Sequence, residues 1–219
     1  MTPRAPAAGI YVNAFLVGGV LMGFEMLGSR YLNPFFGSGI GAWASLISMV
    51  LCALALGYFA GGAVVDRYPS PIVIAASIFL AALYLALVPS TADWIMWGIL
   101  GKIGDGAGAV LLASAALLLV PLTLLGTFSP VAVRLLVRST AETGRVAGLV
   151  YGISTVGNVA GTLVTTFVLI PAMGVRMITY FYAGILVLCA VSLVLPLWRM
   201  AVGAAKIYLA GGSRRPGPA

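Results

Sequence analysis

Six stretches of mostly apolar residues follow one another along the chain, separated by short polar breaks. They cover about residues 10–32, 40–65, 72–88, 107–127, 146–170 and 178–197. A run of about 20 apolar residues crosses the hydrocarbon core of a bilayer as one α-helix. The breaks hold turn-forming pairs such as Asn33-Pro34 and Pro89-Ser90. The pattern predicts an all-α membrane protein with six transmembrane helices in residues 1–198 and a basic tail in residues 199–219.

Residues 90–106 are too polar for a span and too apolar for a free loop. Trp94 and Trp97 lie one helical turn apart there, which favours a short helix at the membrane interface. The first apolar run begins after Arg4 and is interrupted by Glu25, and no small-residue cleavage site follows it. We therefore expect an uncleaved first span.

Composition agrees with the membrane interpretation and narrows the chemistry. Hydrophobic residues make up 62% of the chain and charged residues 8%, whereas a soluble domain has about a quarter of its residues charged. The chain has no histidine, which excludes imidazole catalysis and imidazole metal sites. Neither a nucleophile–base pair nor an acidic metal cluster is visible. We expect no enzyme activity, no cofactor and no metal.

The basic residues predict the orientation. Six spans with both ends in the cytoplasm place most of the 12 lysines and arginines on the cytoplasmic side, namely Arg4, Arg67, Arg134, Arg138, Arg145, Arg199, Lys206, Arg214 and Arg215. Arg30, Lys102 and Arg176 remain on the other side. The positive-inside rule favours this N-in, C-in topology in the plasma (inner) membrane. The net charge of +7 then indicates contacts with anionic lipid rather than with nucleic acid.

Two charged residues lie in or near the end of the first span. An ionised group at a helix centre costs about 2.5–3.5 kcal/mol on insertion. Glu25 shares its helix face with the small residues Gly18, Gly28 and Ser29, so it is either a cation or proton site or a structural partner of a polar group on another helix. Arg30 either extends to the lipid headgroups or binds an anion.

The fifth span combines a polar stripe with an apolar face. The stripe recurs at helical spacing and consists of Tyr151, Thr155, Asn158, Thr162 and Thr166. The opposite face, suited to lipid, consists of Leu149, Ile153, Val156, Leu163 and Phe167. Glycines flank the stripe at Gly148, Gly152, Gly157 and Gly161. A helix of this kind borders either an aqueous pathway or a close helix interface.

The end of the second span carries a short motif. Gly62-Ala63-Val64-Val65-Asp66-Arg67 resembles the G-x-x-x-D-R signature of major facilitator superfamily transporters. The resemblance implies that Asp66 caps or pairs at a neighbouring helix end and that Arg67 helps to hold one side closed. The Gly-Arg-Lys that often follows in that family is replaced by Tyr68-Pro69-Ser70.

Longer blocks resemble the membrane part of spermidine-synthase-like fused transporters. These are Glu25-Met-Leu-Gly-Ser-Arg30-Tyr-Leu-Asn-Pro34-Phe-Phe-Gly37 and Gly148-Leu-Val-Tyr151-Gly-Ile-Ser-Thr155-Val-Gly157, continuing to Leu169-Ile-Pro171. In that family a facilitator-like helical region precedes a soluble aminopropyltransferase-like domain. The present sequence has no strand–Gly-rich-turn–helix unit for a nucleoside cofactor, so polyamine synthesis is not expected of it.

Internal echoes fit the inverted repeat of facilitators, in which two units of three helices have opposite topology. Gly57-Tyr-Phe-Ala60-Gly61 in span two echoes Gly157-Asn-Val-Ala160-Gly161 in span five. Leu27-Gly28-Ser29 and Leu125-Gly126-Thr127 end spans one and four. The resemblance therefore implies half of a facilitator fold with a three-plus-three repeat.

Two functions remain open. The first is a half-size secondary transporter of a small solute, with cations among the candidates. It would act as a homodimer, with spans two and five near the dimer seam, spans one and four lining the cavity, and Glu25 coupling transport to a proton or ion. The second is a non-transporting anchor or regulatory subunit for a separately encoded, aminopropyltransferase-like enzyme, docked through residues 134–145 and the tail.

Overall fold

The computed structural model describes the backbone of residues 7–137 and 139–211, and among these the side chains up to Leu195. Within these ranges every assigned element is helical. Six segments are long and apolar enough to cross a membrane: Ala7–Phe36, Ile40–Arg67, Pro71–Ile103, Ala107–Leu136, Thr140–Ala172 and Val175–Leu195. The predicted all-α class and the prediction of six spans are confirmed. Arg4, Arg138, Arg214 and Arg215, on which the predicted orientation partly depends, lie outside the described residues.

Four of the spans are single helices and two are composite. The single helices are α1 (Ala7–Phe36), α2 (Ile40–Arg67), α3 (Pro71–Ile103) and α9 (Val175–Gly211). The fourth span consists of α4 (Ala107–Ser114), the π-helix η1 (Ala115–Leu119), α5 (Val120–Gly126) and α6 (Phe128–Leu136). The fifth consists of the 3₁₀ turn η2 (Thr140–Glu142), α7 (Thr143–Val164), the π-helix η3 (Thr165–Leu169) and α8 (Ile170–Ala172).

Proline accounts for both π-helices. Each ends two residues before a proline, Pro121 after η1 and Pro171 after η3. A proline has no N–H to donate, and its ring clashes with the carbonyl four residues earlier in an ideal α-helix. A local widening of the turn relieves that clash while the helix continues. Spans four and five therefore share a wide turn that the hydrophobic pattern did not predict.

Two other prolines do not end their helices, and here the structure differs from the predicted boundaries. α3 continues through the buried Pro89 as far as Ile103, so residues 90–103 extend the third span instead of forming a separate interfacial helix. α1 likewise continues past Pro34 to Phe36. The chain then turns at Gly37 and Gly104, whose φ angles of 73° and 85° suit glycine.

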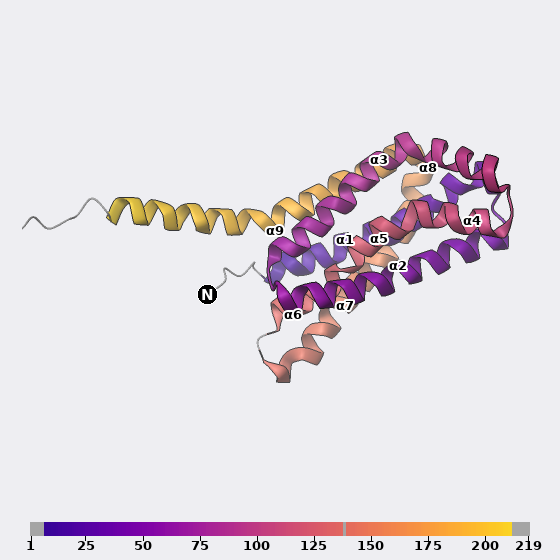
Figure 1. Ribbon diagram of the computed structural model, residues 1–219. Coiled ribbons are helices and arrows are strands. Elements are labelled where there is room, and N and C mark those ends of the chain that lie inside the picture. The colour runs from indigo at the N-terminus through magenta and orange to yellow at the C-terminus, as the bar shows by residue number, and fades with distance from the viewer. Residues whose placement is uncertain (1–6, 138, 212–219) are drawn as a thin grey trace, which may run out of the picture.

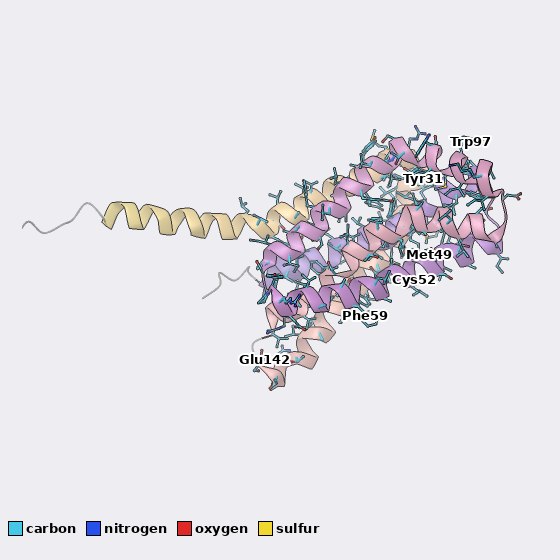
Figure 2. All side chains as sticks on the ribbon, viewed as in Figure 1. Tyr31, Met49, Cys52, Phe59, Trp97 and Glu142 are labelled. Atoms are coloured by element: carbon cyan, nitrogen blue, oxygen red, sulfur yellow. The ribbon has the colours of Figure 1, made fainter. Side chains whose placement is uncertain are left out.

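The six spans form one bundle with both ends of the described chain at the same end. Figure 1 shows that α1 begins near the α2–α3 connection, and that the C-terminal part of α9 projects beyond the bundle from this end. The α1–α2 and α3–α4 connections lie at the opposite end. In Figure 2, Glu142 and Trp97 mark these two ends.

The core lies where α1, α3 and the fourth span meet. Its largest fully buried side chains include Phe24, Leu27, Ile78, Leu118 and Phe128. The most extensive helix pairs are α1 with α7, α3 with α9 and α2 with α5. α7 is the most exposed of the long helices, since Val146, Val150 and Gly157 are its buried residues. Most of its other side chains are exposed on the outside of the bundle.

Candidate functional site

Glycines bring α1 and α7 into backbone contact. A Cβ atom on Gly157 would overlap the carbonyl oxygen of Phe15, and one on Gly161 would overlap the carbonyl oxygen of Gly19. A Cβ on Gly19 would in turn lie 3.3 Å from the carbonyl oxygen of Gly157. Small residues allow such close approach between helices in a membrane. Gly157 and Gly161 therefore hold α7 directly against α1.

A second glycine contact joins α2 to the fourth span. A Cβ on Gly57 would lie 2.9 Å from the Cα of Gly126, and one on Gly61 would lie 2.8 Å from the Cα of Thr127. Both distances are shorter than real Cβ contacts. Gly57, Gly61, Gly157 and Gly161 thus pack within the chain, and a dimer seam would have to use the other faces of α2 and α7.

The remaining glycines that the sequence singled out lie in open space. A Cβ on Gly62, Gly148 or Gly152 would meet no atom within 4 Å. Gly148 and Gly152 therefore take no part in the helix packing that the structure describes. They lie on the exposed part of α7, beside the exposed side chains of Tyr151 and Thr155.

A small cavity lies between α1, α2, the α5–α6 segment and α7. Its volume is about 30 Å³, which leaves room for at least one water molecule. The polar part of its lining is Tyr58, Ser129, Ser154 and Asn158, and α1 contributes Val17, Gly18 and Leu21. Tyr58 also packs edge-on against Tyr151, with ring centroids 6.2 Å apart. We call this space the inner cavity.

Asn158 links the inner cavity to α1. The side-chain amide is oriented so that its nitrogen faces the neighbouring carbonyl oxygens. In this orientation the nitrogen donates to the carbonyl oxygen of Gly18 at 2.8 Å and to that of Ser154 at 3.3 Å. Two threonines of the same stripe bond back to their own helix, Thr155 to the carbonyl of Tyr151 and Thr162 to that of Asn158. Asn158 is therefore the stripe residue that bonds across to another helix.

Glu25 is largely buried and has no polar partner among the described side chains. It is 7% exposed, and among the side chains that the structure describes it makes no hydrogen bond or ion pair. It lies four residues after Leu21, which lines the inner cavity, and four residues before Ser29. Residues four apart share one face of a helix. Glu25 therefore occupies the α1 position between the inner cavity and the pocket that Ser29 lines.

This second space, the outer pocket, lies at the far end of α1. Its volume is about 270 Å³. Ser29, Arg30 and Asn33 come from α1, Ser38 and Trp43 from the α1–α2 connection and the start of α2, and Thr166 and Ile170 from the fifth span. Arg30 is exposed and makes no ion pair with any described residue. Arg30 and Thr166, two residues singled out by the sequence, thus meet in one pocket.

The two charged residues of the facilitator-like motif are exposed at the end of α2. Asp66 and Arg67 are the last residues of α2, and both are exposed. Among the described residues neither forms an ion pair, so the capping or pairing that the resemblance implies for Asp66 is not made in this conformation.

Sequence reasoning missed three polar contacts of α9. The hydroxyl groups of Tyr31 and Thr179 lie 2.9 Å apart, the amide of Asn13 donates to Ser192 at 3.0 Å, and Thr165 pairs with Tyr182. Asn13, Tyr31 and Thr165 are polar residues in apolar spans, which is the signal that could have marked them. Helix periodicity alone does not reveal their partners on the sixth span.

A fourth polar contact joins α9 to α3 outside the core. Arg176 at the start of α9 pairs with Asp93 of α3 at 2.5 Å. Beside it, Trp97 packs edge-on against Phe35, with centroids 5.3 Å apart. The buried side chains of Met96 and Ile99 join residues 90–103 to the core as a continuation of α3, and the exposed ion pair adds little to this.

The chain matches no family model, no curated protein and no solved structure. Within the described residues, no group of three or more cysteine, aspartate or glutamate side chains is placed to hold a metal ion. The candidate site therefore consists of Glu25, the inner cavity with Asn158, and the outer pocket with Arg30.

Proposed function

We propose that the chain is a half-size, major-facilitator-like secondary transporter that works as a homodimer, with both termini in the cytoplasm. The observation that carries this proposal is Glu25, a buried acid without a described partner, on the face of α1 between two polar spaces. A carboxyl group there can take up a proton or another cation from one side and release it to the other. This is the role of many intramembrane acids in transporters.

Helix packing supports the three-plus-three repeat. An inverted repeat exchanges span one with four, two with five and three with six. Under this exchange, the glycine contact of span two with span four becomes a glycine contact of span five with span one, and the chain has both. The exchange also swaps span three (α3) with span six (α9), so their contact with each other is unchanged by it. The echo between Gly57–Gly61 and Gly157–Gly161 thus extends from sequence to packing.

The exposed face of α7 supports the homodimer. Tyr151 and Thr155 are exposed there beside Gly148 and Gly152, and a polar, small-residue face suits a helix partner better than lipid. Figure 2 shows that the Cys52 and Phe59 side chains on α2 point away from the bundle. A second copy packed on α7 and α2 would enclose a central pathway that six helices alone leave open.

The transport proposal is tested with Glu25→Gln, which keeps the size of the side chain and removes its charge. Ligands are first sought by thermal shift with cations, polyamines and amino acids, because a ligand of the folded state raises its melting temperature. The hit is then followed into proteoliposomes. Glu25→Gln should abolish uptake or its pH dependence, while Glu142→Gln, an exposed acid in the α6–α7 connection, should transport like the wild type.

Both variants must elute as folded protein for the comparison to count. Uptake by Glu25→Gln at the wild-type rate and with wild-type pH dependence would remove Glu25 from the site. Failure of every tested solute to shift the melting temperature or to move across the membrane would leave the transporter proposal without support.

One observation favours the second candidate function, a membrane anchor for a separate soluble enzyme. α9 continues as a helix to Gly211, and its C-terminal part projects from the bundle (Figure 1). Such an extension suits docking at the membrane surface. Crosslinking and mass measurement in mild detergent separate the two functions. A homodimer that moves solute supports transport, whereas an obligate complex with an aminopropyltransferase-like enzyme supports the anchor.

A further inference from the structure

We propose that the outer pocket is a binding site for a small oxyanion, a carboxylate or phosphate group held by Arg30. This inference deepens the proposed transport function by naming a chemical class for its ligand. Binding itself does not depend on transport, so the two proposals can fail separately.

The pocket is lined by hydrogen-bond donors that have no acceptor among the described residues. Arg30 carries five N–H donors in a planar fork that matches the two oxygens of a carboxylate or phosphate. The side chains of Asn33, Ser38 and Thr166 also line the pocket and make no hydrogen bond to another described group. Only the Ser29 hydroxyl is already used, since it donates to the carbonyl oxygen of Met26 at 2.8 Å. Four side chains with free donors therefore face one space.

The charge in the pocket is uncompensated. Neither aspartate nor glutamate lines it, and the ion pair among the described residues joins Arg176 to Asp93 at another place. The nearest acid along α1 is Glu25, one turn before Ser29, which is buried rather than part of the lining. A guanidinium group among hydroxyl and amide donors attracts an anion and repels a cation.

Size and lining limit the ligand. A volume of about 270 Å³ is slightly below the range of sites for drug-sized molecules, which begins near 300 Å³, and so suits a ligand somewhat smaller than these. Met26, Trp43 and Ile170 supply the apolar part of the lining. This combination fits a short organic acid or a phosphate group better than a large polyanion.

The oxyanion can come from two sources, a soluble ligand or a lipid headgroup, and two experimental arms distinguish them. In the first, the detergent-purified chain is titrated with acetate, succinate and inorganic phosphate at constant ionic strength while its melting temperature is followed. In the second, the chain is placed in nanodiscs of phosphatidylcholine with increasing phosphatidylglycerol. A soluble ligand stabilises in the first arm, and a headgroup stabilises only in the second.

The variant that tests the site is Arg30→Gln, with Lys102→Gln as the matched control because Lys102 is an exposed cation that does not line the pocket. We expect Arg30→Gln to raise the apparent Kd of the stabilising anion at least about tenfold and Lys102→Gln to leave it unchanged. If Arg30→Gln does not fold, Thr166→Val removes one donor with little change in shape, and a rise in Kd of a few-fold is expected.

The proposal is overturned if no probe stabilises the wild type in either arm. It is also overturned if the substituted Arg30 variant binds as tightly as the wild type, or if Lys102→Gln weakens binding equally, because the effect would then be one of general surface charge. If an anion binds but no transport is detected, the anion-site proposal stands and the transporter proposal is refuted.

Discussion

Replacing Gly161 by alanine should force α1 and α7 apart. The added Cβ would lie 2.5 Å from the Cα of Gly19 and overlap its carbonyl oxygen, whereas ordinary contacts begin at 3.4 Å. The obstructing atoms belong to the backbone of a helix and have no rotamer through which to move away. The two helices therefore have to separate by about 1 Å along this crossing, with loss of dispersion contacts around it.

The expected magnitude follows from overpacking in close-packed interiors, which costs about 1–3 kcal/mol. For a chain of this size, 1 kcal/mol corresponds to about 2–4 °C in melting temperature, so about 2 kcal/mol lowers it by about 4–8 °C. Alanine also favours a helix over glycine by up to about 1 kcal/mol. Gly148→Ala, on the same helix but with no atom of the same chain within 4 Å of its Cβ, measures this gain alone in monomeric protein and should there be neutral or slightly stabilising.

The assay is thermal unfolding in one detergent, followed by the amount of protein that still elutes as a single species after heating. Gly161→Ala should melt below the wild type and Gly148→Ala at or above it. If Gly161→Ala proved as stable as Gly148→Ala, the close crossing of α1 and α7 would be refuted, and with it the packing argument for the repeat.

Two other measurements test the fold. Tyr31→Phe removes the hydroxyl that pairs with Thr179 and should lower the free energy of unfolding by about 0.5–1.5 kcal/mol. Tyr180→Phe, at an exposed position, should leave it unchanged. Equal melting temperatures for the two variants would refute the contact. The topology is tested in a chain whose native cysteines have been replaced. There, Glu142→Cys should react with an impermeant thiol reagent only from the cytoplasmic side, and Lys102→Cys only from the opposite side. Labelling of both positions from one side would contradict the predicted topology.

The number of spans was predictable because it depends on a strong, local signal. Each span is a run of apolar residues that is longer than core helices of soluble proteins, and no tertiary information is needed to count such runs. The helix ends were less predictable. Pro89 and Pro34 are usual places for a helix to stop, yet both helices continue, supported beyond Pro89 by the buried side chains of Met96 and Ile99.

The candidate site was predictable residue by residue but not as an arrangement. Glu25, Arg30 and Asn158 stand out because polar groups are costly in an apolar span. Their neighbours depend on how helices distant in sequence pack. Gly157 and Gly148 look alike in the sequence, yet the first lies against the backbone of Phe15 and the second faces open space. A pattern that gives the face of a helix does not reveal which helix covers it.

The two interpretations of Glu25 that the sequence left open predict different effects of its substitution. A structural acid in a membrane needs a polar partner, because burial of an unpaired ionised group costs several kcal/mol. None of the described side chains of the same chain supplies one. Under the proposed function, the partner is a transported proton or cation, or a group from a second copy. The second case predicts that Glu25→Gln weakens the homodimer, so its mass in mild detergent should fall toward that of a monomer. A dimer that stays intact while uptake is lost assigns the carboxyl group to the transported ion.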